Sequence, residues 1–195
     1  MRELFIQMEP SEKLRTLIFA EPGACNTDAT LDAACERAKT LGIEQMVVAT
    51  STGQTALSAA QCFDGRVIAV TLSAGHWETY CPPDPEIIQK CKDLGAQVLT
   101  GTHTLLGGID GAISSIGGVA AAEVIGRTYY TISQGTKVAV ECALMAADAG
   151  ALDMNAEAIT IAGTGGGADT ALVIQPAFSN TAFDLQIREV LAMPR

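Results

Sequence analysis

The amino-acid sequence predicts an α/β fold, a three-layer sandwich around a mostly parallel sheet. Short apolar segments alternate with segments of helical periodicity along most of the chain. The segments MVVA and VIAV are continuously apolar, which is typical of strands buried on both faces of a parallel sheet. The chain has 195 residues, of which 48% are hydrophobic and 17% are charged. This composition suits a sizeable core, so we expect a single domain over residues 1–195.

The first half of the chain predicts four strands separated by three helices. Asn26, Thr27 and Asp28 supply side chains that commonly cap a helix, and Gly42 ends that helix. A proline-rich start and a terminal glycine, Gly95, bound another helix. The predicted strands span 16–20, 46–50, 66–71 and 97–100, and the predicted helices lie at 26–42, 55–63 and 82–95.

The second half is interrupted by glycines. Glycines recur between residues 104 and 118, and they indicate a loop with a short helix. Residues 137–149 carry the strongest helical pattern of this half, which ends before Gly150. Segments 158–162 and 171–175 are predicted as two strands of a hairpin joined by a glycine loop, and 187–193 as a last strand.

The charge balance limits the partners of the protein. Its formal net charge is -10 and its pI is about 4.5, whereas nucleic acid and anionic membranes are bound by basic patches. The sequence has no run of about eighteen apolar residues that would span a membrane. Its N-terminal segment is charged and lacks the apolar stretch of a signal peptide. We therefore expect a cytoplasmic protein that binds neither nucleic acid nor a membrane.

The cysteines and histidines do not indicate a metal site. No two cysteines form a C-x-x-C pair, which argues against a zinc ribbon or a thioredoxin-type motif. The two histidines, His76 and His103, are too few for a histidine-rich metal site. Cys35, Cys91 and Cys142 fall at apolar positions of predicted helices, so we interpret the thiols as small hydrophobic side chains of the core.

A loop of small residues, residues 51–55, follows the second predicted strand in the stretch VVATSTGQTA. In open parallel sheets, ligands bind beyond the carboxyl ends of the strands. The amides and the dipole at a helix N-terminus favour a phosphate there. The loop is not a Walker A motif, because the Gly-Lys-Ser/Thr ending is missing. Serine and threonine also commonly cap helices, so a plain helix cap stays open as the alternative.

A second loop, GTGGGADT, joins the two strands of the predicted hairpin. A tight turn needs only one or two glycines, and this loop has more. Because each extra glycine costs conformational entropy, we interpret them as allowing close approach to a ligand or to neighbouring backbone. A flexible turn, in which Asp169 caps its own loop, is the alternative.

Five pieces of the sequence, in this order and spacing, resemble a known family. They are Glu21-Pro22-Gly23 with Asn26-Thr27, then VVATSTGQTA, MAADAGA, GADTALVIQPA and the terminal Met193-Pro194-Arg195. The strand that runs into Ser/Thr-Gly-x-Ser/Thr-Ala and the later AITIAGTGGGADTALVIQP are similar to the C-terminal domain of pyruvate kinase. Nearly the whole chain resembles the stand-alone proteins called pyruvate kinase α/β-domain-like.

The resemblance implies that the protein binds a phosphorylated ligand, but it does not indicate which reaction, if any, the protein catalyses. The catalytic groups of pyruvate kinase belong to its barrel domain, which has no counterpart here, so we expect no pyruvate kinase activity. Regulated pyruvate kinases hold a phosphate of a sugar bisphosphate in this loop, often with an arginine where this chain has Gln54. Stand-alone members have been associated with bound FMN, and their activity is not established. The related domain also mediates subunit contacts, which implies a homo-oligomer.

By this resemblance the chain is an FMN-binding protein, and flavin-dependent oxidoreductase activity is one hypothesis for its function. A regulatory module that binds a phosphorylated metabolite without catalysis is the second hypothesis, and a subunit with a role in assembly is the third. The loop at 51–55 would hold the ribityl phosphate, and the glycine loop would lie against the same ligand. The candidate cofactor-binding residues are Ser51, Thr52, Gly53, Gln54, Thr55, Thr71, His76, His103, Gly163, Thr164, Gly165, Gly166, Gly167 and Asp169.

Other polar and aromatic residues near this edge have ordinary interpretations. Trp77 would stack on a flavin ring or fill a partly buried gap. His103 would face the ligand or form hydrogen bonds at the surface. Lys137 and Glu141 lie one helical turn apart, which predicts a simple ion pair. No residue stands out as catalytic, and no metal ligand is predicted.

Overall fold

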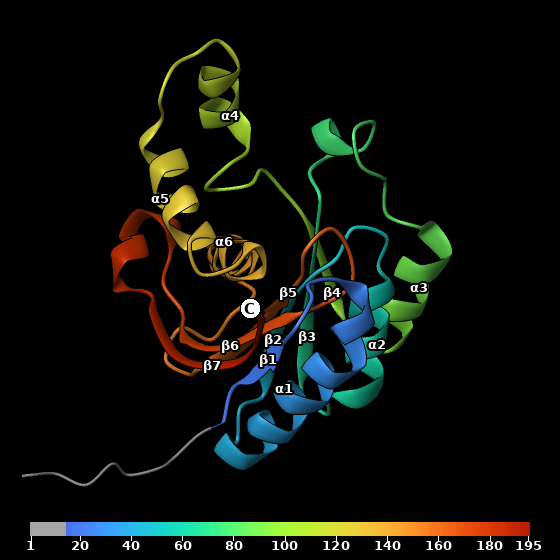
Figure 1. Cartoon of the computed structure of the whole chain (residues 1–195). Coiled ribbons are helices and arrows are strands. Elements are labelled where there is room, and N and C mark those ends of the chain that lie inside the picture. The colour runs from blue at the N-terminus through green and yellow to red at the C-terminus, as the bar shows by residue number, and fades with distance from the viewer. Residues whose placement is uncertain (1–14) are drawn as a thin grey trace, which may run out of the picture.

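The computed structural model describes residues 15–195, which form one seven-stranded sheet with helices on both faces (Figure 1). The strands are β1 (Leu17–Phe19), β2 (Gln45–Ala49), β3 (Arg66–Thr71), β4 (Gln97–Thr100), β5 (Ala158–Ala162), β6 (Thr170–Gln175) and β7 (Gln186–Pro194). The helices are α1 (Thr27–Leu41), α2 (Gln54–Cys62), α3 (Pro85–Asp93), α4 (Gly108–Ser115), α5 (Ala121–Tyr130) and α6 (Gln134–Asp148). Short 3-10 helices are η1 (Ala24–Asn26), η2 (Ala74–His76) and η3 (Ser179–Asp184).

The strand order is β1-β7-β6-β5-β2-β3-β4. Strands β5, β2, β3 and β4 are parallel neighbours, and β1 pairs in parallel with β7. Strand β6 runs antiparallel to both β5 and β7, so the predicted hairpin is present. The prediction of an α/β fold with a mostly parallel sheet is therefore confirmed.

Two hydrophobic cores lie on opposite faces of the sheet. Helices α1, α2 and α3 cover one face, where Leu31, Ala56 and Cys91 pack against strand residues such as Met46. Helix α6 lies across the other face and is buried along most of its length, with α5 packed beside it. Every residue of β5 is buried, as expected for a central strand covered on both faces. The layers thus account for the continuously apolar segments of the sequence.

Most predicted elements are found within one or two residues of their predicted ends, and the exceptions have clear causes. Helix α5 was not predicted, and it packs beside α6. The predicted capping of α1 by the Asn26 side chain is wrong. The Asn26 side-chain amide donates instead to the Glu21 carbonyl, and Thr27 Oγ1 donates to the Ala24 carbonyl. These hydrogen bonds stabilise the turn that precedes α1, and they do not cap the first amides of the helix.

The prediction that all the thiols fill the core is wrong for several of them. Cys91 and Cys142 are buried, but Cys25 and Cys62 are exposed and Cys35 is half-buried. The sulfur atoms of Cys35 and Cys62 lie 3.0 Å apart, and both cysteines are free. None of the helices in residues 15–195 is long and apolar enough to cross a membrane.

The parallel strands determine where polar loops gather. Register pairs such as Val48 with Ile161 and Thr71 with Thr100 show that β5, β2, β3 and β4 end at one edge of the sheet. Four loops leave the sheet there, and together with the first turn of α6 we call them the carboxyl edge. The loops are residues 50–53, 72–77, 101–107 and 163–169.

Candidate functional site

The loop after β2 is held rigidly at the carboxyl edge. The Thr50 amide donates to the Val70 carbonyl at 2.9 Å, and the Asp84 amide, at the start of α3, donates to the Thr52 carbonyl at 2.9 Å. Gly53 has a φ of 106°, which a residue with a side chain rarely adopts. Glycine at this position therefore lets the chain turn directly from the strand into α2.

The N-cap residue of α2 is Gly53, which has no side chain to cap the helix. We call this start of α2 uncapped in that sense. Thr50 Oγ1 accepts from the Gly53 amide at 3.0 Å, and Thr52 Oγ1 accepts from the Gln54 amide at 3.4 Å, a long contact. The alternative of a plain helix cap therefore describes Thr52 in part, because its hydroxyl makes only this long contact with the first amide of α2. Thr52 and Gln54 are exposed, Ser51 is half-buried, and Thr55 is buried.

The glycines of the loop at 163–169 are explained mostly by the protein itself. A Cβ atom on Gly163 would lie 2.6 Å from the Gly167 carbonyl oxygen, and one on Gly167 would lie 2.6 Å from Ala24 Cα. Gly165 has a φ of 76°. Gly166 faces open space and is exposed. Close approach to neighbouring backbone therefore explains why residues 163 and 167 are glycines. Gly165 and Gly166 have open space where a side chain would be.

Asp169 joins three segments instead of facing outward. It is fully buried, and its Oδ2 accepts from the Gly23 amide at 2.9 Å and from the Thr164 amide at 3.0 Å. Its Oδ1 accepts from Thr170 Oγ1 at 2.9 Å. Both oxygens are thus engaged by the chain, as the alternative of a loop-capping aspartate predicted. Asp169 positions the glycine loop, and because it is fully buried it has no exposed surface for a direct contact with a cofactor.

The end of β3 is a second polar point of the carboxyl edge. Thr71 is buried, and its hydroxyl lies 2.6 Å from the hydroxyl of Thr100 on β4. His76 Nδ1 lies 2.8 Å from Ser73 Oγ, and the ring is half-buried. Trp77 Nε1 donates to the Leu72 carbonyl at 2.9 Å, so the indole fills a gap in its own loop. Thr71 and Trp77 therefore hold this loop in place. His76 was predicted to bind the cofactor, and its ring is partly accessible.

The rings of His76 and His103 lie near each other. Their centroids are 5.7 Å apart and their planes are inclined by 28°. His103 belongs to the loop after β4, so this contact joins the ends of two neighbouring strands. His103 is not the surface histidine of the ordinary interpretation, because its side chain is only 17% exposed and lies against Glu141.

The charged pair on α6 is deeply buried. Lys137 Nζ lies 2.5 Å from Glu141 Oε2, which confirms the predicted ion pair, but the side chains are only 4% and 1% exposed. Lys137 Nζ also lies 5.9 Å from the centre of the Tyr130 ring. The sequence predicted the Glu141 ion pair, but it did not place Glu141 in the candidate site. The available signal was a lysine and a glutamate inside the otherwise apolar helix KVAVECALMAADA.

Glu141 holds the loop after β4 by charge and by hydrogen bonds. Its Oε1 accepts from the Leu105 and Leu106 amides at 2.8 and 3.1 Å. Burial by itself would raise the pKa of Glu141. The hydrogen bond with His103 and the charge of Lys137 outweigh burial and lower that pKa to about 2. The carboxylate therefore stays ionised at every pH at which the protein would function.

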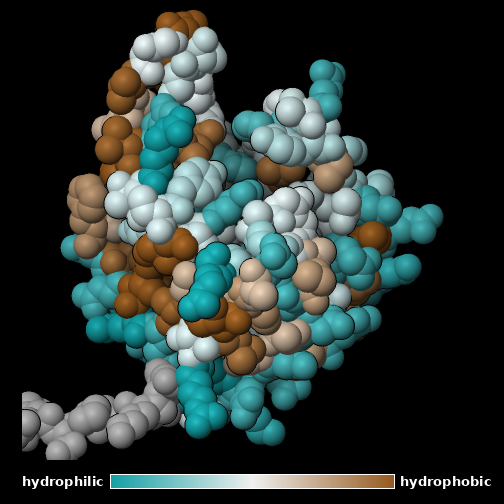
Figure 2. Space-filling view, viewed as in Figure 1, coloured by the Kyte–Doolittle hydropathy of each residue, from teal (hydrophilic) through white to brown (hydrophobic). Residues whose placement is uncertain are grey.

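Two polar atoms near Glu141 are buried without a partner in the part of the chain that the structure describes. They are His103 Nε2 and Thr104 Oγ1. Buried polar atoms almost always have a hydrogen-bond partner in proteins. These two atoms therefore indicate a place where a ligand or a water would form hydrogen bonds. In the space-filling view the surface is hollowed above the carboxyl edge, between the projection that carries α4 and α5 and the segment around η2 (Figure 2).

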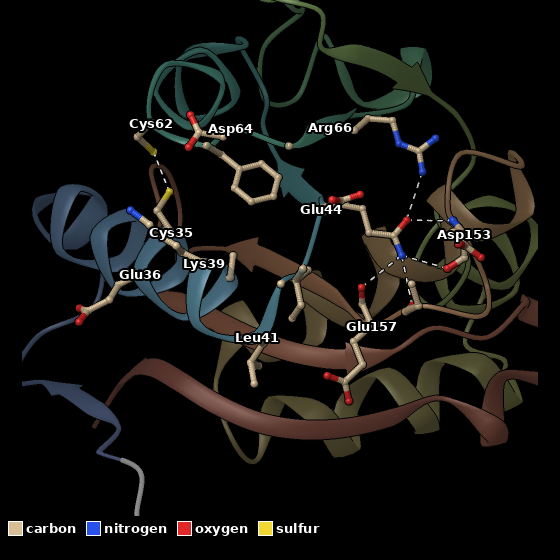
Figure 3. Close-up of a pocket in the computed structure, with 17 residues that line it drawn as sticks. Cys35, Glu36, Lys39, Leu41, Glu44, Cys62, Asp64, Arg66, Asp153 and Glu157 are labelled. Carbon is tan, nitrogen blue, oxygen red and sulfur yellow. Dashed lines mark hydrogen bonds between the residues drawn. The ribbon is translucent and has the colours of Figure 1, made fainter.

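A depression at the opposite edge of the sheet differs chemically from the carboxyl edge. It has a volume of about 1290 Å³ and is lined by the ends of α1 and α2 and the starts of β2 and β3 (Figure 3). The Gln45 side chain inside it already donates to three carbonyls and accepts two hydrogen bonds. None of the candidate cofactor-binding residues lines it. In residues 15–195 there is no group of three or more metal-binding side chains.

The comparison with known protein families matches the architecture described above. The family model described as pyruvate kinase, alpha/beta domain, matches residues 28–174, which is well over half of the chain. The match runs from the first turn of α1 to the last residue but one of β6, and it includes all four loops of the carboxyl edge. The chain therefore belongs to the family of the pyruvate kinase alpha/beta domain.

Proposed function

We propose that this protein binds FMN at the carboxyl edge, with the ribityl phosphate at the N-terminus of α2. The observation that carries the proposal is the start of α2, whose N-cap residue, Gly53, has no side chain, with the exposed residues Thr52 and Gln54 beside it. An uncapped helix start offers free amides and the positive end of the helix dipole. The sequence has no lysine or arginine between Lys39 and Arg66, so these groups would have to offset the phosphate charge.

The other residues of the edge suit the rest of the same ligand. Gly166 is exposed and has open space where a side chain would be, so it leaves room beside the loop after β2. The rings of His76 and His103 lie close together at the ends of β3 and β4. His103 Nε2 and Thr104 Oγ1 lack partners within the described residues, which fits a ligand that makes hydrogen bonds there. When bound, FMN would supply redox chemistry, which is the basis of the oxidoreductase hypothesis.

A titration with two flavins tests this proposal. Quenching of flavin fluorescence is measured for FMN and for riboflavin, which lacks the phosphate. The proposal predicts that FMN binds at least about tenfold more tightly than riboflavin, because the phosphate contributes charge-assisted hydrogen bonds. A visible spectrum of the purified protein with the bands of a flavin would support it further. Equal affinities for the two flavins would contradict the placement of the phosphate, and no binding of either would contradict the function.

The same loop also favours the second candidate function. A regulatory module would use the uncapped start of α2 for the phosphate of a metabolite, without flavin chemistry. A colourless protein that binds sugar phosphates but not FMN in the same titration would favour this alternative.

We also infer that the protein self-associates through the projection formed by α4 and α5. This projection carries exposed apolar side chains, which are visible as brown atoms over α4 and α5 (Figure 2). Ile116 is 86% exposed and Val119 is 81% exposed. Clustered apolar exposure of this kind marks interaction surfaces. Light scattering should give a mass above that of the monomer at micromolar concentration, and Ile116→Glu should lower it. A monomer mass for the unchanged protein would contradict this inference.

A further inference from the structure

A buried carboxylate and a histidine form a pair that no part of the phosphate site requires. His103 Nδ1 lies 3.4 Å from Glu141 Oε2, across the contact between the loop after β4 and helix α6. Glu141 is 1% exposed, and the His103 ring is mostly buried. Their elements come from distant parts of the sequence, so the contact exists only in the folded protein.

The Glu141 carboxylate is fixed on all sides. Two backbone amides, of Leu105 and Leu106, donate to one oxygen, and Lys137 donates to the other. A carboxylate with three such contacts cannot rotate without leaving buried donors unpaired. It also stays ionised, so toward His103 it can only accept a hydrogen bond.

This arrangement determines where the neutral His103 ring carries its proton. Because Glu141 only accepts, the proton of the neutral ring belongs on Nδ1, the nitrogen that faces Glu141. Nε2 then has a free lone pair. That atom is buried, and it has no partner among residues 15–195. A carboxylate that orients a histidine in this way leaves the other nitrogen ready to accept a proton.

The charged and titratable groups around this pair are few. Lys137 lies on the same helix as Glu141, and its Nζ is close to the Tyr130 ring of α5. His76, from the loop after β3, faces the His103 ring. The Lys137 and Glu141 charges offset each other, so the pair adds no net charge to the site in its neutral histidine form.

We propose that His103 is a base of the ligand site, that its Nε2 accepts a proton from an N–H or O–H group of the bound ligand, and that Glu141 is the positioning residue behind it. In the transfer the N–H or O–H bond of the ligand breaks and its electron pair stays on the ligand. A new bond forms between Nε2 and the proton, and Glu141 stabilises the imidazolium through Nδ1. This inference rests on the proposed function only for the identity of the ligand, which is a flavin or a substrate with such a group.

Nitrogen NMR of the histidine rings tests the pair without any ligand. The chain has two histidines, so a ¹⁵N-labelled sample gives two sets of ring signals, and His76→Gln assigns them. The proposal predicts that neutral His103 carries its proton on Nδ1, and that Glu141→Gln lowers the population of this form. A proton on Nε2 in the unchanged protein would overturn the proposal, even if Glu141→Gln proves too unstable to study.

Flavin titrations then test the role of Nε2. His103→Phe keeps a ring but removes the acceptor, and we expect it to weaken FMN and riboflavin alike by about tenfold, the factor for one lost hydrogen bond. The ring nitrogen signal of His103 should shift when FMN is added to the unchanged protein. Unaltered affinity and an unshifted signal would overturn the role of Nε2 while FMN binding stands. If FMN does not bind at all, the proposed function fails. The NMR measurement of the His103 tautomer then still tests the role of Glu141.

Discussion

The two edges of the parallel strands differ in how far their buried polar groups are satisfied by the protein itself. The depression of about 1290 Å³ lies at the amino edge, where its central polar side chain is fully engaged by the backbone. The carboxyl edge has an uncapped helix start, a buried charged pair and two polar atoms without partners in the described chain. Unsatisfied polar groups, rather than volume, therefore identify the candidate site.

Gln45 shows how the amino edge is completed internally. Its Nε2 donates to the carbonyls of Asp153, Ala156 and Glu157 at 2.9 to 3.3 Å. Its Oε1 accepts from the Asp153 amide and from Arg66. Figure 3 shows these hydrogen bonds as dashed lines between residues that line the depression. A side chain with this many partners tethers a turn to the start of β2, and it has little capacity left for a ligand.

The largest effect on stability is expected at the carboxyl edge, from Glu141→Gln. The substitution leaves Lys137 as a buried charge without its partner, which should lower the free energy of unfolding by about 3–5 kcal/mol. Denaturant unfolding measures this loss. Glu157→Gln is the matched control, because the Glu157 pair with Arg188 is at the surface and contributes at most about 1 kcal/mol. Equal effects of the two substitutions would show that the Glu141 pair is not a buried one.

The same pair predicts a dependence of stability on pH. The pKa of Glu141 is about 2 in the folded protein, below its ordinary value of 4.5, so its ionised form is favoured by folding. The stability that Glu141 contributes is therefore fully present above about pH 4.5 and is lost as the pH falls toward 2. The difference in stability between the unchanged protein and Glu141→Gln should shrink over this range. A difference that stays constant would argue against the lowered pKa.

At the amino edge, Gln45→Met should lower stability without affecting the ligand. Methionine has a similar shape but leaves a buried amide and several carbonyls unpaired, which costs about 1–3 kcal/mol. The exposed neighbour Glu44 provides a control, and Glu44→Gln should leave the melting temperature nearly unchanged. FMN affinity should be unaltered in both variants. A large loss of FMN affinity in folded Gln45→Met would move the site to the depression of Figure 3.

The smallest expected effect is an oxidation at the amino edge. Cys35 and Cys62 have sulfur atoms 3.0 Å apart, close enough for oxidised glutathione to convert the two thiols to one disulfide while it is itself reduced. Counting thiols in the denatured protein should then give four in place of six. Cys62→Ser cannot form this internal disulfide, so the paired loss of two thiols should be absent under the same treatment, and flavin affinity should not change. An unchanged count in the original protein would show that the two thiols do not react as a pair.

The sheet was predictable because its strands are short apolar runs with clear boundaries. Segment 66–71 coincides with β3, since burial on both faces leaves a strong signal in the sequence. Segment 97–100 coincides with the edge strand β4, which is only partly buried but follows the helix-ending Gly95 closely. Helix α5 was missed because a glycine and β-branched residues interrupt it and no side chain caps its N-terminus. Sequence patterns therefore identify buried apolar strands more readily than helices of mixed composition such as α5.

The candidate site was predictable only in its location. Loops at the carboxyl ends of parallel strands follow from the strand and helix order, so the position of Thr52 at this edge could be foreseen. The contact between His103 and Glu141 could not, because it joins residues whose distance depends on how α6 crosses the sheet. The glycines at 163 and 167 were explained by backbone contacts that likewise arise only on folding.

The most direct test of the central claim is the affinity of FMN for Thr52→Glu, with Thr52→Gln as the matched neutral control. Thr52 is exposed beside the uncapped start of α2, so a glutamate there would place a carboxylate where the phosphate is proposed to bind. Thr52→Glu should weaken FMN binding at least about a hundredfold, because of like-charge repulsion, while Thr52→Gln should have a much smaller effect. Both variants should keep the fold, since glutamate and glutamine are acceptable near a helix N-terminus. Equal FMN affinity in folded Thr52→Glu and in the unchanged protein would contradict the claim that α2 binds the phosphate.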